Sequence, residues 1–438
     1  MSPHAAAIGF QLSATPLNRS PMGLLIAAPA EFPLLLLCAG TVMYWLVGEG
    51  FQRGHTPFIG ASRGDDFSTD DPADMARVLS ASMVCATAVT IVSGAIACRF
   101  SFRAYMILCA VFAGFIYPIS AGWVWSTGFL SPQSSMTAID FAGSGVVHLQ
   151  GATIALTAAI LVGPRLGRFV TDPSTGLRIP STDFNGNSIV LTALGTLILV
   201  FGWFGFNAGA TGGLSAGRHQ VAALAALNTA AAGSSALITG LFLTRYMAKS
   251  YNLWEVLNST LAGLVAVTAA CATVGPAVAL GIGILAAFTY HFTSKQVLRW
   301  GIDDVVGVFS VHGTPGMVGL LCAGLFSRQD YIDAAYGPNV ISYQPGLQFG
   351  IQLLLLVCVV GWSFLTGGMV LWILSKTVGI RVSSEDEIVG LDFKYHSGSE
   401  SHTTDASRRT RRAAGTKRQA SAAHGDLHSG QHSTHPLL

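Results

Sequence analysis

The sequence predicts an all-α polytopic membrane protein, and three observations lead to this fold class. Of the 438 residues, 51% are hydrophobic and only 11% are charged, whereas soluble domains carry about 25% charged residues. Apolar runs of about 20 residues recur along the chain, and each is long enough to cross a bilayer as a helix. These runs are continuous and do not alternate in polarity, which favours helices over a β-barrel.

We predict ten membrane spans, which together form one transmembrane domain over residues 31–380. The spans are 31–48, 78–98, 104–126, 141–163, 188–210, 220–246, 254–273, 275–295, 305–326 and 347–377. Residues 1–30 hold one arginine and no acid, and we expect an unstructured leader there, with a targeting segment as the alternative. Residues 381–438 form a polar tail, which we expect to be disordered from about residue 398.

Basic residues gather in alternate loops, which predicts how the chain lies in the membrane. The richer set comprises Arg99, Arg103, Arg165, Arg168, Arg178, Arg245, Lys249, Lys295 and Arg299. The positive-inside rule places this set in the cytoplasm, and an even number of spans then puts both chain ends there. The tail beyond the last span is typical of a solvated segment; a metal site at its last four histidines is the weaker alternative.

Two stretches of the sequence share one layout. They are DFAGSGVVH (140–148) and DVVGVFSVH (304–312). In both, a glycine follows the acid by three residues, a valine by seven and a histidine by eight. Each stretch opens an apolar run of membrane length, so we interpret them as the two halves of an internal repeat.

The histidines of the repeat, His148 and His312, are candidate functional residues because an ionisable side chain inside a membrane span is costly. The repeat would place both rings at equivalent depth, where they could face each other along a narrow path. One imidazole can donate while the other accepts, so a neutral pair can share a proton. The alternative is two separate histidines, each hydrogen-bonded to a neighbouring helix.

Acids and aromatic residues near the span ends have two interpretations each. Asp140 is either a helix cap or an acid that recruits a cation, and its charge could serve both purposes. Asp303 and Asp304 are interpreted as helix caps. The aromatic residues of interest could form an interfacial belt or a cation-π vestibule with a phenylalanine plug. They are Trp123, Trp125, Trp203, Phe204 and Phe206.

The sequence offers no motif for a resident cofactor, a metal or an enzyme active site. Its seven cysteines show no CxxC spacing, and neither an HExxH motif nor a P-loop occurs. We therefore expect no cofactor and no enzyme activity. The net charge of +2 gives no indication of a nucleic-acid partner.

Six motifs, in this order, resemble the ammonium transporter family (Amt/Mep/Rh), and their wording is closest to its eukaryotic Amt branch. They are DFAGSGVVH (140–148), GPRLGRF (163–169), FGWFGFNAGA (201–210), LNSTLAGLVAVTAACATVGP (257–276), DDVVGVFSVHGTPGMVGLLCAGLF (303–326) and GLD (390–392). The resemblance covers residues 40–396 and implies an inverted-repeat fold of eleven helices. It also implies a homotrimer in contact with membrane lipids, most typically in the plasma membrane.

The resemblance also implies roles for individual residues. His148 and His312 would be the twin pore histidines. Trp125 would be the tryptophan of an outer cation site, with Asp140 as the acid that supports it. Phe206 would be one of two stacked gate phenylalanines. The substrates implied are ammonium and ammonia, with methylammonium as a candidate.

The chain departs from the family pattern at several positions. The family's first helix has no counterpart, which leaves ten spans in place of eleven. The second gate phenylalanine falls on Val84, and the serine of the outer site falls on Ala210. Gly390 and Asp392 match the tail segment that couples subunits, but the threonine that follows in plant members falls on Lys394.

We therefore expect an ammonium transporter that captures the cation at its outer mouth, deprotonates it and conducts ammonia past the twin histidines. The alternative is an ammonium sensor, or an inactive paralogue, that signals through the cytoplasmic tail.

Overall fold

The computed structural model describes residues 39–53, 56, 58–59, 71–181, 184, 186 and 188–391. The predicted leader and most of the predicted tail, with Asp392 and Lys394, lie outside the described residues. Elements labelled η are π-helical. In chain order the elements are η1 (Tyr44–Gly48), α3 (Glu49–Arg53), α4 (Pro72–Ile96), α5 (Phe102–Val111), η3 (Phe112–Ile116), α6 (Tyr117–Trp125), η4 (Ser144–Leu149), α7 (Gln150–Val162), β1 (Phe169–Thr171), β2 (Arg178–Pro180), α8 (Ile189–Gly209), α9 (Arg218–Ala248), α10 (Leu253–Val267), α11 (Pro276–Arg299), η5 (Phe309–Gly313), α12 (Thr314–Phe326), α13 (Gln329–Tyr336), α14 (Pro345–Thr377) and α15 (Ser384–Val389).

The predicted all-α polytopic fold class is confirmed. Within the described part of the chain, 8 helices are long and apolar enough to cross a membrane, and each overlaps a predicted span. The shorter α10, with 15 residues, overlaps a ninth. The remaining predicted span, 31–48, is described only from residue 39 onward. Its described part leads into η1 and α3.

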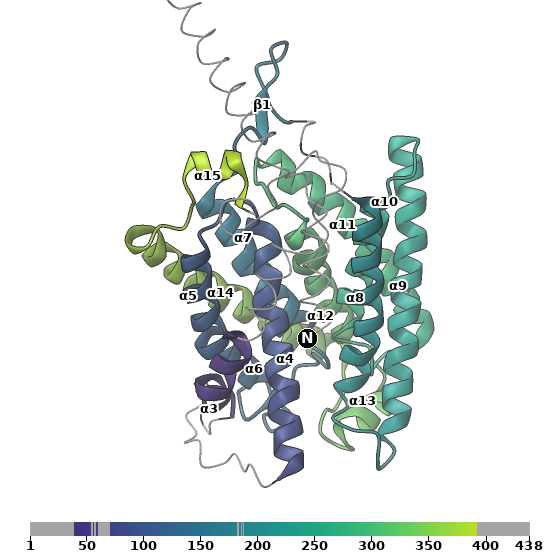
Figure 1. The fold of residues 1–438 in the computed structure, drawn as a ribbon. Helices are drawn as coiled ribbons and strands as arrows, with labels where there is room; N and C mark the ends of the chain where they lie inside the picture. Colours follow the sequence, from purple (N-terminus) through teal and green to yellow (C-terminus); the bar gives the residue numbers. More distant parts are fainter. Residues whose placement is uncertain are drawn as a thin grey trace, which may run out of the picture.

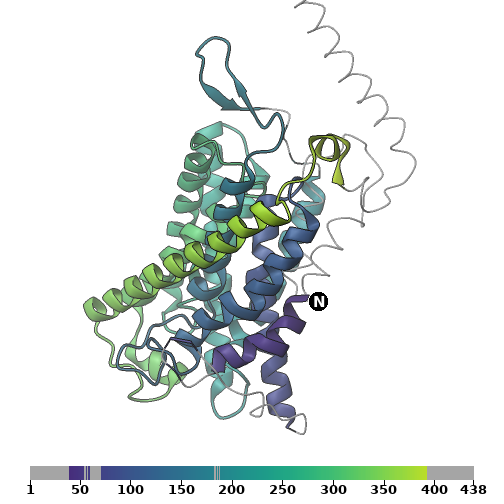
Figure 2. The ribbon, with the colours of Figure 1, turned by 90° about the vertical axis from the view of Figure 1, so that its left-hand side faces the viewer.

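The helices form a bundle with two ends (Figure 1). We call the end that carries α15 and the β1–β2 hairpin the tail end, at the top of the view; α3 and α13 lie at the opposite end. α9 packs along α10 and α11, and α4 packs along α7. The long α14 crosses α7 and α12 at a slant, as Figure 2 shows.

The two repeated segments run in opposite directions through the bundle. The carbonyl of Gly163, just after α7, accepts a hydrogen bond from the Arg99 side chain, which also donates to the carbonyl of Asp303, shortly before η5. The first segment therefore ends at the tail end, where the second begins. This antiparallel arrangement is that of inverted halves.

The span predicted over 254–273 stops being helical at Val267, because the chain beyond it bonds to another segment. The carbonyl of Thr268 accepts from the amide of Ala142 at 3.2 Å, and that of Ala269 accepts from Phe141 at 3.0 Å. These bonds replace the helical ones for carbonyls that have no water nearby. Two non-helical segments thus meet inside the bundle.

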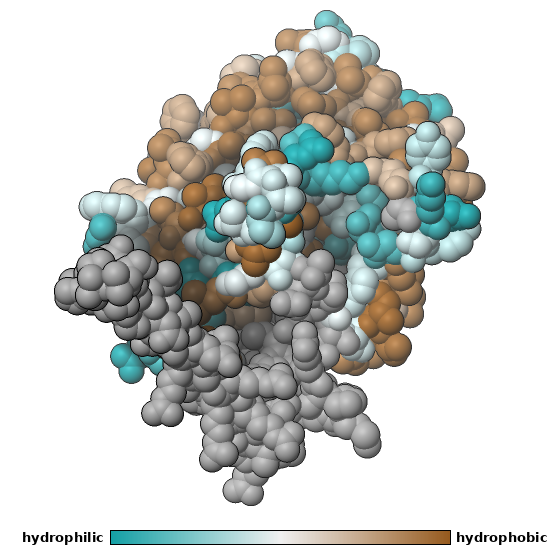
Figure 3. Space-filling view, turned by 90° about the horizontal axis from the view of Figure 1, so that it is seen from above, coloured by the Kyte–Doolittle hydropathy of each residue, from teal (hydrophilic) through white to brown (hydrophobic). Residues whose placement is uncertain are grey.

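The outside of the bundle is apolar, as a lipid-facing surface requires. α8, α9 and α14 expose large side chains, among them Phe201 at 79%, Phe242 at 72% and Leu365 at 68%. Seen from the tail end in Figure 3, hydrophobic residues cover much of the flanks, and hydrophilic ones gather on the face toward the viewer. By contrast, η4 is wholly buried at the centre, and α7 is buried over most of its length.

A buried ionic cluster joins the loops of the tail end. Arg165 donates from Nε and Nη2 to the two oxygens of Asp303 at 2.8 and 2.9 Å, and Arg168 approaches the same carboxylate at 3.3 Å. Burial alone would raise the pKa of Asp303, but Arg165 and Arg99 outweigh it and lower that pKa to about 2. The expectation that Asp303 caps a helix is therefore wrong, because its carboxylate serves as an ion-pair partner.

The segment after α14 is bound to the same region. Arg381 donates to the carbonyls of Val162 and Pro164, and it pairs with Glu387 of α15 at 2.8 Å. Glu387 in turn accepts from the amide of Leu166 at 2.8 Å. The start of the tail is thereby attached to the end of α7.

We expect Asp303→Asn to destabilise the protein by about 3 kcal/mol, because it leaves buried guanidinium groups without their carboxylate. The measurement is the midpoint of thermal unfolding of detergent-solubilised protein at pH 7. The matched control is Asp330→Asn, since Asp330 pairs with Arg328 where both side chains are 57% exposed. Such surface pairs contribute about 0–1 kcal/mol. Equal effects at the two sites would contradict the prediction.

The effect should also depend on pH. The folded-state pKa of Asp303 is about 2, below the value of about 3.9 for an unfolded aspartate. Its contribution is thus fully present above pH 4 and is lost as the pH falls toward the folded-state pKa. The difference between wild type and Asp303→Asn should accordingly shrink below pH 4.

Candidate functional site

His148 and His312 meet at the centre of the bundle. Their Nδ1 atoms are 3.2 Å apart, and their rings are stacked with centroids 5.2 Å apart at an interplanar angle of 15°. Both side chains are buried. A contact between two Nδ1 atoms at this distance needs one donor and one acceptor, so one of the two Nδ1 atoms carries a hydrogen and the other does not.

Each histidine lies in a π-helical turn, His148 in η4 and His312 in η5. Such turns are rare and occur frequently at functional sites. Before η4, Gly143 has a φ of +105°, and its carbonyl accepts from the amides of both Val147 and His148. A Cβ atom at Gly143 would lie 2.5 Å from Val147 and 3.1 Å from Trp125, so only glycine suits this entry to the turn.

The acids of the repeat sit at the starts of these two turns. Oδ2 of Asp140 accepts from the amides of Gly145 and Val146, both at 3.0 Å. Asp304 accepts from Val308 and Phe309 in the same manner, both at 2.8 Å. Both carboxylates thus cap helix N-termini. Oδ1 of Asp140 is buried and has no hydrogen-bond partner among the described residues.

Trp125 lies beside Asp140. Its Nε1 donates to the main-chain carbonyl of Asp140 at 2.8 Å, and the indole is half-buried. This bond fixes the indole next to the residue that carries the free carboxylate oxygen. The two residues named for an outer cation site are therefore adjacent, at the end of α6.

Aromatic rings flank the histidine pair. Trp203 stacks on His148 with centroids 5.1 Å apart at 15°, and Phe206 is 5.9 Å from the same ring. The indole Nε1 of Trp203 donates to the Thr268 hydroxyl at 2.9 Å. From the sequence, Trp203 was expected in an interfacial belt or a cation-π vestibule. The structure places it at the histidine site. Trp123 packs elsewhere, against Phe129 and Trp362.

The remaining candidates are placed by their elements. Val84 is half-buried on α4, and Ala210 is exposed directly after α8. Phe204 is 36% exposed on α8. Gly390 ends α15 with a φ of +98°, and its amide donates to the carbonyl of Asp386.

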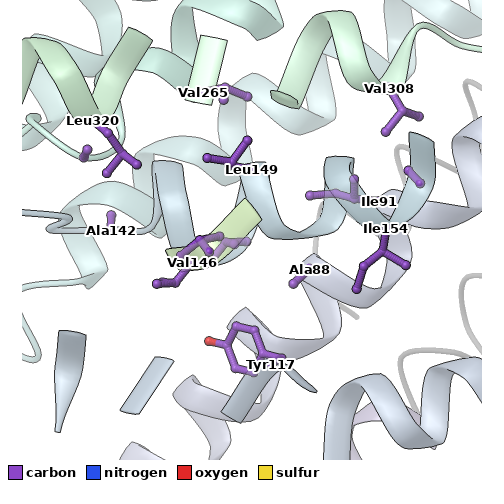
Figure 4. Close-up of a cluster of buried hydrophobic side chains, with 14 of the residues drawn as sticks. Ala88, Ile91, Tyr117, Ala142, Val146, Leu149, Ile154, Val265, Val308 and Leu320 are labelled. Carbon is purple, nitrogen blue, oxygen red and sulfur yellow. The ribbon is translucent and has the colours of Figure 1, made fainter. Parts of the chain in front are cut away.

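The turn that carries His148 also contributes apolar side chains to the buried core. Figure 4 shows Val146 and Leu149 of η4 among the side chains of Val265 and Leu320. All four are buried. A site of this kind offers hydrogen bonds to a small neutral molecule at two imidazoles and little to stabilise a bare ion.

Sequence reasoning missed two buried glutamines, Gln348 and Gln352 of α14. Both reach the segment before Asp140: Gln348 donates to the carbonyl of Thr137 at 2.9 Å, and Gln352 bonds to both peptide groups of Ile139. A signal for them existed, because two glutamines four residues apart inside an apolar span mark one polar stripe on a helix.

Known proteins match this chain over most of its length. The model of the Ammonium Transporter Family matches residues 32–401. The ammonium transporter Amt2 of Archaeoglobus fulgidus is 41% identical over 325 residues, which is 71% of this chain and 67% of that protein. Ammonium transporter 1 member 3 of Solanum lycopersicum is 35% identical over 387 residues, 82% of each chain.

Solved structures share the fold. A structure described as "Sensor Amt Protein" superposes with a TM-score of 0.76 at 30% identity, covering 90% of this chain and 94% of its own. Mep2 of Saccharomyces cerevisiae has a TM-score of 0.74 at 20% identity, covering 87% and 84%, and shows the fold alone. From the matched family model and the relatives above 30% identity, the chain belongs to the ammonium transporter family.

Proposed function

We propose that this chain captures ammonium beside Trp125 and Asp140, removes a proton there and conducts ammonia past His148 and His312. The observation that carries the proposal is the 3.2 Å contact between the two buried Nδ1 atoms. Two imidazoles in an apolar setting can bond to ammonia and can pass on a proton. Ammonium transport, the activity for which the family is named, needs groups that do both.

Capture needs groups that stabilise a cation before it loses its water. The half-buried Trp125 offers a π-face, a contact worth about 0.5–2 kcal/mol. The buried carboxyl group of Asp140, whose main chain bonds to the Trp125 indole, adds negative charge nearby. Both belong to the end of the bundle away from the basic loops, which the positive-inside rule puts outside the cell.

Passage through the centre favours the neutral molecule. A bare ion loses far more hydration energy than an uncharged amine when it enters apolar surroundings. Ammonium can avoid this cost by leaving its proton at the mouth, whereas potassium has no proton to lose. Selectivity against potassium then follows from the chemistry of deprotonation.

The setting we propose for this activity is a homotrimer in the plasma membrane, with the tail end in the cytoplasm. In this arrangement the α15 segment and Gly390, next to the undescribed Asp392, would face a neighbouring subunit and couple the pores. The attachment of Glu387 to Leu166 supports a role for the tail, because it joins this segment to the end of the helix that follows His148.

A sensor is the second candidate function. It is supported by the 30% identity to the structure described as "Sensor Amt Protein" over 90% of this chain. Uptake of radiolabelled methylammonium by yeast that lacks its own ammonium transporters separates the two functions. Saturable uptake supports the transporter, and its absence with full membrane abundance supports the sensor.

We expect His148→Ala to lower methylammonium uptake by about tenfold or more, since loss of one buried hydrogen-bond partner costs about 1–3 kcal/mol. The matched control is His291→Ala. His291 is also buried, but it bonds to Ser259 and Glu255 away from the pair, so uptake should be kept. Normal uptake by His148→Ala at equal membrane abundance would rule out the histidine pore.

We expect the double variant Val84→Phe, Ala210→Ser to lower the apparent KM for methylammonium about threefold, because it supplies the gate phenylalanine and the outer-site serine that the family resemblance implies at these positions. The matched control carries Val84→Leu with Ala210→Ser, which adds bulk at position 84 without an aromatic ring. If KM is the same in wild type and both variants, these two positions do not contribute to capture.

A further inference from the structure

We propose that Gln352 of α14 is a positioning residue for the capture site, holding Asp140 and Trp125 in place through the peptide groups of Ile139. The inference rests on the proposed function and adds to it a residue from a helix that none of the site residues belongs to. Its basis is a set of hydrogen bonds between segments 213 residues apart in the sequence.

The Gln352 side chain is fully buried and makes three hydrogen bonds to backbone groups, besides a longer one of 3.5 Å that its Oε1 accepts from Nε2 of Gln348. Oε1 accepts from the amide of Ile139 at 2.8 Å. Nε2 donates to the carbonyl of Ile139 at 2.6 Å and to the carbonyl of Leu320 at 3.1 Å. Both donors and the acceptor of the amide are therefore engaged.

The segment that Gln352 bonds to is non-helical. Residues 137–140 form neither helix nor strand, so their peptide groups have no regular partners inside the bundle. Backbone groups at such depth need side-chain partners when no water is present. Gln352 satisfies both groups of Ile139 at once, much as a neighbouring β-strand would.

Ile139 is joined directly to the residue that organises the capture site. The carbonyl of Asp140 accepts the Trp125 indole, and the carboxylate of Asp140 caps η4. A rotation of the Ile139 peptide would therefore move both the indole and the carboxylate. Gln352 prevents that rotation and ties the segment to α12 through Leu320.

Gly324 of α12 lies close against the Gln352 side chain. A Cβ atom at Gly324 of α12 would come within 2.9 Å of the Gln352 Cγ and of the Phe349 backbone. This glycine allows α14 to approach α12 closely enough for the amide to reach Leu320. The amide is thus held by packing as well as by its three hydrogen bonds to the backbone.

Kinetics test the proposal through Gln352→Leu, with Gln348→Leu as the matched control. Gln348 lies one turn earlier on the same face and donates to the carbonyl of Thr137 at 2.9 Å. It also reaches Oε1 of Gln352 at 3.5 Å, so the control removes this long bond but leaves both bonds between Gln352 and Ile139. We expect Gln352→Leu to raise the apparent KM for methylammonium about fivefold, the size of a weakened cation-π contact. The maximal rate should change less than twofold, and the control should change KM less than twofold.

A double variant separates positioning from general damage. In a Trp125→Leu background, Gln352→Leu should raise KM no further, because both changes remove the same interaction. An unchanged KM in the single variant, or effects that multiply in the double variant, would overturn the inference. If Gln352→Leu does not reach the membrane, Gln352→Asn, one methylene shorter, should raise KM about twofold.

Hydrogen–deuterium exchange gives a second measurement that does not need transport. In the full chain in detergent, peptides covering residues 137–142 should exchange faster in Gln352→Leu than in wild type and in Gln348→Leu. Equal exchange in all three would overturn the positioning role. A wild type without uptake but with this exchange pattern would instead overturn the proposed function alone.

Discussion

The structure depends on one constraint: every peptide group inside an apolar bundle must find a hydrogen-bond partner without water. Where the chain departs from helix, at residues 137–143 and 268–274, the departing segments bond to each other. The Ser144 hydroxyl bridges them, because it donates to the carbonyl of Val265 and accepts from the amide of Ala269. The site residues lie where backbone groups bond to another segment or to a side chain in place of a helical partner.

The same constraint explains the charged residue at the other end of the bundle. Arg99 is completely buried, and burial lowers its pKa to about 10, which still leaves it charged. Its guanidinium donates to four carbonyls, including those of Gly163 and Asp303. The buried guanidinium thus supplies hydrogen bonds to the carbonyls of three chain segments, as backbone amides do within a helix.

The sequence predicted the parts of the fold that depend on local pattern. Apolar length located the spans, and the equal spacing from Asp140 to His148 and from Asp304 to His312 singled out the pair of histidines. It could not reveal partners chosen by packing. Asp303 carries the same local signal as Asp304, yet one is an ion-pair partner and the other a cap, since only Asp303 faces Arg165. Nor does hydrophobic periodicity distinguish a π-helical turn from an α-helical one.

The π-helical turns make this chain sensitive to the number of residues in each turn. A π-helical turn holds one more residue than an α-helical turn, so removal of a single residue from η4 would restore a regular helix at little backbone cost. Because a π-helical turn spreads its extra residue over about the same rotation, the two sides of η4 would keep nearly the same orientation, but the residues inside the turn, His148 among them, would change direction. Insertions and deletions in 144–149 should therefore be rarer among working homologues than side-chain substitutions.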